Sequence, residues 1–213
     1  MTDSTGAASR VADALRAQIG SGVLVPGTRL SEDRVRAEHG VSRSTLREAF
    51  RLLIRDRLLV HELSRGVFVR QLSRRDVSDL YEVRRIIECA ALRHIRTLRP
   101  EGLRRLHAAV NDGRAGVEDG RWDAVAAASI RFHEALVALA GSERLDTIIS
   151  GVLAEFRLAY AHMTDTQVFH AAFLKRNREI AELLGAGDVE GASGMLESYL
   201  VEAEEALLDD FIT

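Results

Sequence analysis

The sequence predicts a mainly α-helical protein in two parts: an N-terminal winged helix-turn-helix domain, then an all-α antiparallel bundle of about six helices. Three observations predict this. Residues 40–55 combine an apolar stripe with a row of arginines, β-prone runs occur only between residues 58 and 70, and helical periodicity continues after residue 75. The expected parts are a flexible tail at 1–8, the first domain at 9–72, a linker at 73–75 and the bundle at 76–213.

The first domain begins with two predicted helices. Val11, Leu15 and Ile19 lie at helical spacing and define the first of them. Ser31 is suited to cap the second, a short helix, because its hydroxyl can accept a free N–H of the first turn. Gly40 can adopt the left-handed conformation that ends a helix, so a tight turn should follow.

A third predicted helix follows this turn and begins after Ser42, another good N-cap. Its apolar residues recur at helical spacing, at Leu46, Ala49, Phe50 and Leu53. Its arginines recur every four residues on a neighbouring face, at Arg43, Arg47, Arg51 and Arg55. A helix of this kind can pack on its own domain and present cations to a groove, as a DNA recognition helix must. The competing interpretation is an ordinary solvated helix face.

A β-hairpin is expected after the third helix. Residues 58–62 and 67–70 are β-prone, and the segment between them ends in Arg65 and Gly66. Such a hairpin forms a wing, and Arg65 at its tip would reach a minor groove or a phosphate.

Charge divides the chain in the same way. Residues 1–75 hold 14 Arg and 8 acidic residues, a balance of +6, whereas residues 76–213 have a balance of −9. Polyanion binding therefore belongs to the first domain, and it should weaken as salt rises.

The remaining composition fits a cytoplasmic protein. The lone Cys89 cannot form an internal disulfide, and we expect it to be a small buried core residue. No signal-peptide pattern and no apolar run of about 18 residues is present, so neither secretion nor membrane insertion is expected.

The second domain is predicted to be entirely helical. Candidate helices cover residues 76–98, 100–119, 121–140, 142–162, 168–185 and 188–210. Their short connections imply antiparallel neighbours, and a small ligand would bind between facing helices.

Several motifs resemble a known family. Pro26-Gly27-x-x-Leu30-Ser31-Glu32, Gly40-Val41-Ser42-Arg43 and Leu46-Arg47-Glu48-Ala49 resemble the winged helix of the GntR family of bacterial transcription regulators. The FCD effector domain of the FadR subfamily is similar to Tyr81-Glu82-Val83-Arg84-Arg85-x-x-Glu88, Phe132-His133-Glu134-Ala135-Leu136 and Ala140-Gly141-Ser142-Glu143-Arg144-Leu145.

The resemblance implies a homodimer on palindromic double-stranded operator DNA, modulated by a small-molecule effector that is a carboxylate. By position, the DNA-binding residues would be Arg34, Ser42, Arg43, Ser44, Thr45, Arg47, Arg65 and Gly66. Two positions depart from the family. Asp33 stands where many relatives have an arginine, and Arg57 where relatives often have a glycine.

Many FCD domains hold a divalent metal ion with an Asp-x-x-x-His pair and one histidine on each of two later helices. Here the corresponding residues are Ser129, His133, Asn177 and Tyr199. One imidazole with a hydroxyl, an amide and a phenol is a poor metal site, so we expect no metal and no cofactor. The four groups would instead bind the effector directly, with Arg84 clamping its carboxylate.

Plainer roles compete with this interpretation. His133, Asn177 and Tyr199 could be satisfied polar groups inside a bundle, and Arg84 could pair with Glu88 on the surface. Arg157 is a weaker ligand candidate. His162 and His170 lie near a predicted loop and are expected to face water.

Two other functions remain open at this point. The protein could be a DNA-binding dimer that senses nothing, its second domain serving only dimerisation. A metal-dependent enzyme is the other alternative, but the chain has no HExxH, GxSxG, P-loop or GxGxxG pattern.

Overall fold

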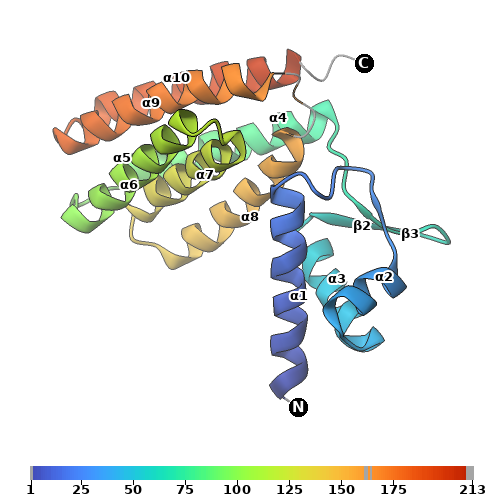
Figure 1. Cartoon of the computed structure of the whole chain (residues 1–213). Helices are drawn as coiled ribbons and strands as arrows, with labels where there is room; N and C mark the ends of the chain where they lie inside the picture. Colours follow the sequence, from blue (N-terminus) through green and yellow to red (C-terminus); the bar gives the residue numbers. More distant parts are fainter. Residues whose placement is uncertain (1, 161–162, 164, 210–213) are drawn as a thin grey trace. The chain divides into compact units, whose positions relative to one another are not determined.

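The structure, a computed structural model, describes residues 2–160, 163 and 165–209 (Figure 1). The chain forms two compact units, Met1–Leu72 and Ser73–Thr213, and the division falls at the start of the expected linker. The mainly α-helical fold class is confirmed, as are the winged N-terminal unit and the helical C-terminal unit.

The N-terminal unit combines three helices with a small sheet. Its elements are α1 (Thr2–Gly20), β1 (Arg29–Leu30), α2 (Glu32–His39), α3 (Arg43–Arg55), β2 (Leu59–Glu62) and β3 (Gly66–Val69). The strands are antiparallel in the order β1-β3-β2, so the predicted hairpin is present and gains a third strand. That strand, β1, pairs Leu30 with Val67. It was not predicted, because two residues carry no recognisable alternation.

The segment expected to be a flexible tail, residues 1–8, lies almost entirely within a helix. Helix α1 already begins at Thr2. Ala8 is only 1% exposed and belongs to the same buried face as Val11, Ala12 and Leu15. The packed face of α1 therefore reaches as far toward the N-terminus as Ala8.

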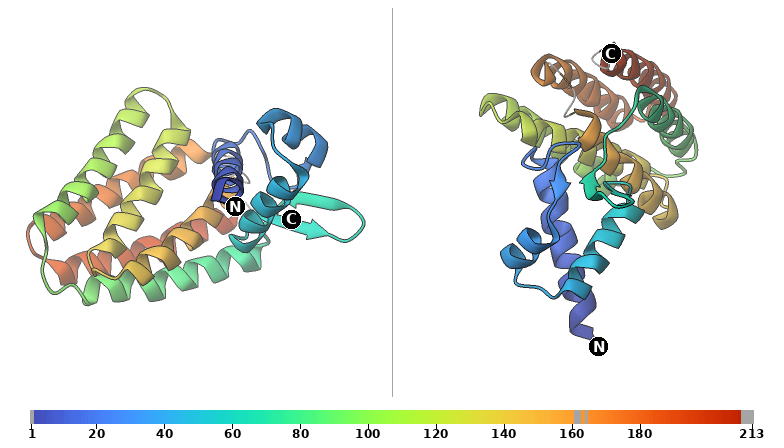
Figure 2. Two further views of the ribbon diagram at one scale, coloured as in Figure 1. Left: turned by 90° about the horizontal axis from the view of Figure 1, so that it is seen from below. Right: turned by 90° about the vertical axis from the view of Figure 1, so that its right-hand side faces the viewer.

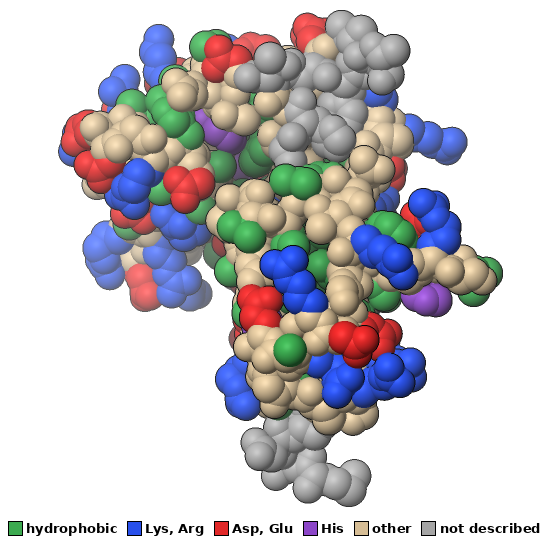
Figure 3. Space-filling model, turned by 45° about the vertical axis from the view of Figure 1, so that its right-hand side comes forward, with side chains coloured by type: hydrophobic (Ala, Val, Ile, Leu, Met, Phe, Trp, Pro, Cys, Tyr) green, Lys and Arg blue, Asp and Glu red, His purple; other side chains and the backbone are tan. Residues whose placement is uncertain are grey.

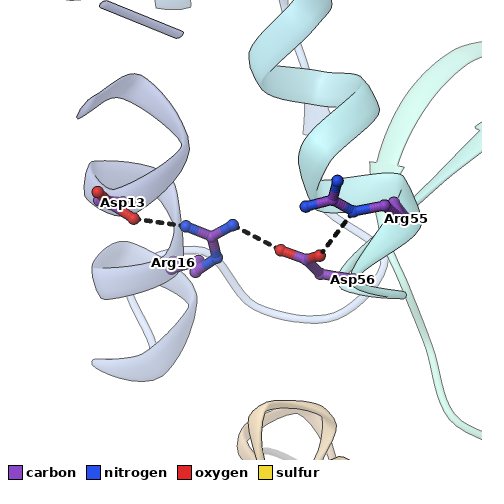
Figure 4. Close-up of polar contacts among 4 residues, drawn as sticks. All are labelled: Asp13, Arg16, Arg55 and Asp56. Carbon is purple, nitrogen blue, oxygen red and sulfur yellow. Dashed lines mark hydrogen bonds and ion pairs between the residues drawn. The ribbon is translucent and has the colours of Figure 1, made fainter. Parts of the chain in front are cut away.

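Charged groups join α1 to the end of α3, its main packing partner (Figure 4). Arg16 donates through Nη2 to Asp56 Oδ2 and through Nη1 to Asp13 Oδ1, both at 2.5 Å. Asp56 is the C-cap of α3, and its other oxygen accepts from Arg55 Nε at 3.5 Å. Arg16 therefore connects the first helix to the residue that terminates the third.

Two residues with positive φ shape the turns around α3. Gly40 adopts φ 61° after α2, as predicted, and directs the chain into the Ser42 cap. Arg57 follows α3 with φ 56°, a conformation that glycine adopts without strain and arginine does not. The position where relatives often carry glycine thus keeps glycine-like backbone geometry here.

The C-terminal unit is built from helices throughout its described residues (Figure 2). They are α4 (Arg74–Arg84), the π-helical turn η1 (Arg85–Cys89), α5 (Ala90–Arg93), α6 (Pro100–Glu118), α7 (Trp122–Ala138), α8 (Glu143–Tyr160), α9 (Thr166–Gly185) and α10 (Val189–Asp209). Helix α6 packs on α7, and α9 packs on α10.

The first predicted bundle helix, 76–98, differs most from its prediction. It begins at Arg74, because Ser73 and Asp76 form a reciprocal capping box, and it ends at Arg93. Between these limits it contains the wide turn η1, a feature that often marks functional sites. Cys89 lies in this turn and is buried, and burial raises the pKa of its thiol to about 11.

Of the helices described, none is long and apolar enough to cross a lipid bilayer.

Candidate DNA interface and candidate effector site

The N-terminus of α3 presents a compact polar surface. Ser42 caps the helix by accepting from the Thr45 backbone N–H at 3.1 Å, and its hydroxyl lies 2.8 Å from that of Ser44. Ser42, Arg43, Ser44 and Arg47 are all exposed at this end of α3, and Arg34 is exposed on α2. Arginine and acidic side chains adjoin one another over α2 and α3 in the space-filling view (Figure 3).

Thr45 does not lie on this presented surface, contrary to expectation. It is 7% exposed, and its hydroxyl lies 2.8 Å from the Ser42 hydroxyl. Thr45 therefore supports the Ser42 cap from below instead of facing outward. The family resemblance placed Thr45 with its neighbours at the DNA, but successive residues are rotated by about 100° around a helix and do not share a face.

The tip of the wing is exposed, as the hairpin prediction requires. Arg65 forms an ion pair with Glu62, and its guanidinium carbon lies 5.4 Å from the Phe68 ring centroid. Ser64 and Gly66 both adopt positive φ, 62° and 112°, and this bends the tip tightly. Arg65 is thus an exposed cation at the wing tip that also contacts Glu62 and the Phe68 ring.

The candidate effector site lies inside the C-terminal unit and begins with Arg84 and Glu88. Arg84 Nε donates to Glu88 Oε1 at 2.6 Å, and the two side chains are 2% and 0% exposed. Burial alone would raise the pKa of Glu88, but the charge of Arg84 and the contact with His133 lower it to about 2. The pair is ionised and buried, whereas the plainer interpretation placed it on the surface.

His133 continues this network from α7. Its Nδ1 lies 2.6 Å from Glu88 Oε2, and its Nε2 lies 3.0 Å from the Tyr199 hydroxyl. A carboxylate can only accept, so Nδ1 carries the proton and Nε2 accepts from Tyr199. Burial lowers the pKa of His133, and the neutral imidazole is therefore favoured. Both ring nitrogens are occupied.

Ser129 and Asn177 complete the set of predicted residues. Asn177 Nδ2 donates to Ser129 Oγ over a long 3.5 Å, and Ser129 also contacts the Tyr199 hydroxyl. The five residues predicted for the effector site, Arg84, Ser129, His133, Asn177 and Tyr199, therefore form one connected group drawn from four helices.

Three buried polar atoms in and beside this group have no hydrogen-bond partner among the described residues. They are Arg84 Nη2, the Tyr81 hydroxyl and Asn177 Oδ1. Buried polar atoms are almost always paired, since leaving one unpaired costs about 1–3 kcal/mol. The described residues therefore leave one donor, one hydroxyl and one acceptor without a partner.

Aromatic rings surround the charged end of the site. The Arg84 guanidinium lies 4.7 Å from the Phe156 centroid and 5.4 Å from that of Tyr81. His170, expected to face water, is instead 3% exposed and lies edge-on to Tyr160 at 4.8 Å. His170 lies within α9 (Thr166–Gly185), on the side that packs against Tyr160. His162 lies outside the described residues.

Two important residues of these sites were missed from the sequence. Glu88 was treated only as a surface partner of Arg84, although it links Arg84 to His133. Tyr81 was quoted within a motif but given no role. Tyr81, Arg84 and Glu88 fall at the i, i+3, i+7 spacing of one helix face, and that pattern was the available signal. Arg157 on α8 is half-buried, and no described contact joins it to the group.

The donor set does not fit the divalent metal of related domains. At the four corresponding positions His133 is the single imidazole, and both its nitrogens already have protein partners. Across the described ranges, no group of three or more His, Cys, Asp or Glu side chains is arranged to hold an ion. Nothing in the chemistry of this site therefore requires a metal.

A winged helix-turn-helix joined to an all-helical unit defines a class of DNA-binding regulators. Comparison with known families agrees. Residues 7–69 match the bacterial regulatory proteins of the gntR family, and residues 79–202 match the FCD domain. The chain belongs to the gntR family, whose members are DNA-binding transcription regulators and not enzymes, and carries an FCD domain.

Individual relatives support the same assignment. A solved structure described as a GntR transcriptional regulator from Rhodococcus sp. RHA1 is 41% identical, with a TM-score of 0.91 over 96% of this chain and 99% of that one. The regulator YdhC of Bacillus subtilis is 30% identical over 140 residues, which are 65% of this chain and 62% of YdhC. The gluconate operon transcriptional repressor of Bacillus licheniformis is 39% identical over 79 residues, 37% of this chain and 32% of the repressor.

Proposed function

We propose that this protein is a transcription regulator of the FadR subfamily. It acts in the cytoplasm as a homodimer on a palindromic operator, and a small organic acid bound in the C-terminal unit changes its affinity for DNA without a metal ion. The DNA-binding part of this proposal rests on the exposed cap of α3, where Arg43 and Arg47 stand beside two serine hydroxyls.

Each α3 would enter a major groove, the two copies meeting successive grooves about one helical turn apart (~34 Å). Arginine can bind guanine O6 and N7 together, so Arg43 and Arg47 would read bases, while Ser42 and Ser44 bind phosphates. Arg34 and the wing tip at Arg65 and Gly66 would add contacts at the edges. Thr45 would act indirectly, through its contact with Ser42.

The effector part of the proposal is carried by one observation: Arg84 Nη2, the Tyr81 hydroxyl and Asn177 Oδ1 are buried without partners. A carboxylate would accept from Arg84 and Tyr81, and a hydroxyl on the same molecule would donate to Asn177. Ser129, His133 and Tyr199 form the wall that holds these groups in position. The acid would bind more tightly to one arrangement of the two protomers than to another. This difference would shift the affinity for the operator by about 1–3 kcal/mol.

The DNA-binding part is tested by selecting the operator from a random duplex library and then measuring Arg47→Ala. Loss of one base-reading arginine should weaken specific binding by about 1–3 kcal/mol. Arg51→Ala is the matched control, because Arg51 is exposed one turn further along α3 and pairs with Glu48. Equal effects of the two variants would reject the assignment of the α3 N-terminus as the reading surface.

The effector part is tested by thermal shift with a panel of small carboxylates, with divalent metals and with a chelator. An acid that raises Tm while metals and chelator have no effect is the expected result. Tyr81→Phe should then abolish this shift with no loss of stability in the absence of acid, since the hydroxyl it removes has no partner there. If no acid raises Tm, the C-terminal unit serves dimerisation alone, and if the chelator lowers Tm, a metal is bound.

A further inference from the structure

Glu32 is an acidic residue placed among the arginines that are proposed to read DNA. Its Oε2 lies 3.7 Å from Arg43 Nε, and its Oε1 lies 3.9 Å from Arg47 Nε. One carboxylate therefore faces two guanidinium groups that are one helical turn apart on α3. Among the residues that the structure describes, neither arginine has another ion pair.

The backbone holds these three side chains in register. Glu32 is the first residue of α2 and follows its cap Ser31, while Arg43 is the first residue of α3 and follows its cap Ser42. The two capped helix starts are connected through α2 and the turn at Gly40, whose φ is 61°. Glu32 is thus presented to α3 by a helix start with defined geometry and not by a loop.

The contacts are too long for hydrogen bonds, and all three side chains are at least one-third exposed. An exposed ion pair of this kind contributes little to folding. Its main effect is on the orientation of the arginines. The Glu32 carboxylate approaches both arginines at Nε, so the two outer nitrogens of each guanidinium remain free for the two-point contact with guanine O6 and N7.

We propose that Glu32 is a positioning residue for sequence specificity, which orients Arg43 and Arg47 toward bases and limits their use on phosphates. This inference rests on the proposed DNA-binding function. The carboxylate reduces the local charge of the trio from +2 to +1, and non-specific binding depends mainly on such charge. Base contacts depend on orientation, so one acid lowers non-specific affinity while it preserves specific affinity.

The test compares Glu32→Gln with Asp33→Asn on the intact dimer. Both variants remove one negative charge from the first turn of α2. Asp33, however, is 82% exposed and pairs with Arg36 of its own helix at 3.2 Å, so it leaves Arg43 and Arg47 untouched. Affinity is measured for the operator selected by the wild-type protein, for the same duplex with its guanines replaced, and for random duplex, each over a range of salt concentrations.

Glu32→Gln is expected to bind random duplex more tightly, with a salt slope steeper by about one phosphate contact, and to lose specificity on the order of tenfold. Asp33→Asn should retain the wild-type ratio of specific to random binding. Glu32→Asp, which keeps the charge but withdraws it by one methylene, should lose specificity without the gain in random binding. Unchanged Tm in all three variants excludes a folding effect.

Three results would overturn the inference. Equal changes in Glu32→Gln and Asp33→Asn would mean that only net charge matters. If Glu32→Gln kept the wild-type ratio of specific to random binding, Arg43 and Arg47 would not need Glu32 to orient them. A loss confined to operators with one particular cytosine would mean that Glu32 contacts that base directly. If the wild-type protein selects no sequence at all, the proposed DNA-binding function itself fails, and this outcome is distinct from the other three.

Discussion

Arg84 and Glu88 form an ion pair inside the C-terminal unit, with Arg84 Nε 2.6 Å from Glu88 Oε1 and side chains that are 2% and 0% exposed. The pair lies across the start of the π-helical turn, and Glu88 extends it to His133. Buried pairs of this kind are expensive to break, because the remaining charge has no solvent to compensate it. The pair also positions Arg84, whose Nη2 has no partner among the described residues.

Breaking this pair should strongly destabilise the protein. Glu88→Gln leaves the Arg84 charge buried and unbalanced, and we expect the free energy of unfolding to fall by about 3–5 kcal/mol in urea titrations. Adding Arg84→Met should recover part of the loss, because no buried charge remains. As a control, Glu101→Gln removes the exposed partner of Arg105 at the same i,i+4 spacing and should cost less than about 1 kcal/mol. Similar losses at both pairs would contradict the role of burial.

Stability should fall as the pH is lowered below the ordinary pKa of histidine. Burial lowers the pKa of His170 from 6.5 to about 4. Between these values the unfolded chain binds the proton and the folded chain does not, so the stabilising effect is complete above pH 6.5 and lost progressively down to pH 4. The shift corresponds to about 3 kcal/mol. His133, whose pKa is also lowered by burial, should add to the fall.

The measurement is urea unfolding of the wild type and of His170→Phe at several pH values. His170→Phe keeps an aromatic ring beside Tyr160 and should flatten the part of the curve between pH 6.5 and 4 that His170 causes. His107→Phe, at an exposed position on α6, should leave the curve unchanged. If the stability of His170→Phe fell with pH as steeply as that of the wild type between pH 6.5 and 4, His170 would be protonated in the folded protein over this range. A separate loss is expected below pH 4.5, since the pKa of Glu88 is lowered to about 2.

Relieving the strained turn after α3 should stabilise the N-terminal unit. Arg57 has φ 56°, where an L side chain costs about 1–2 kcal/mol relative to ordinary regions. Arg57→Gly should therefore raise Tm, with a net gain of about 0.5–1 kcal/mol after the extra entropy of glycine in the unfolded chain. Gly40→Ala tests the reverse. Gly40 has φ 61° and no atom within 4 Å of an added Cβ, so a lower Tm would report backbone strain alone.

The connection between α1 and α3 should make a measurable contribution through Arg16. Arg16→Met keeps the apolar stem but removes the contacts with Asp13 and Asp56, and stability should fall by about 1 kcal/mol. Asp56→Asn and the double variant complete a mutant cycle. Additive effects would show that Arg16 and Asp56 do not interact in solution, whereas a coupling of about 0.5 kcal/mol or more would establish the contact of Figure 4.

Local rules were sufficient for much of this fold. The caps at Ser31 and Ser42, the left-handed Gly40 and the hairpin depend on interactions within a few residues, so the sequence predicts them directly. The helices of the C-terminal unit follow from periodicity in the same way. The two-residue strand β1 and the helical start at Thr2 depend on partners elsewhere in the N-terminal unit, and these elements were missed.

By itself, the sequence determined the class of fold, and it predicted the recognition-helix pattern and five residues of a candidate effector site, because each is encoded in spacing along one helix or in a family motif. Tertiary structure alone decided what those residues face. It buried Arg84 with Glu88, turned Thr45 and His170 inward, and placed Glu32 between Arg43 and Arg47. Helical periodicity defines which residues share a face, but the charge state, exposure and partners of that face are set by the neighbouring helix that packs against it.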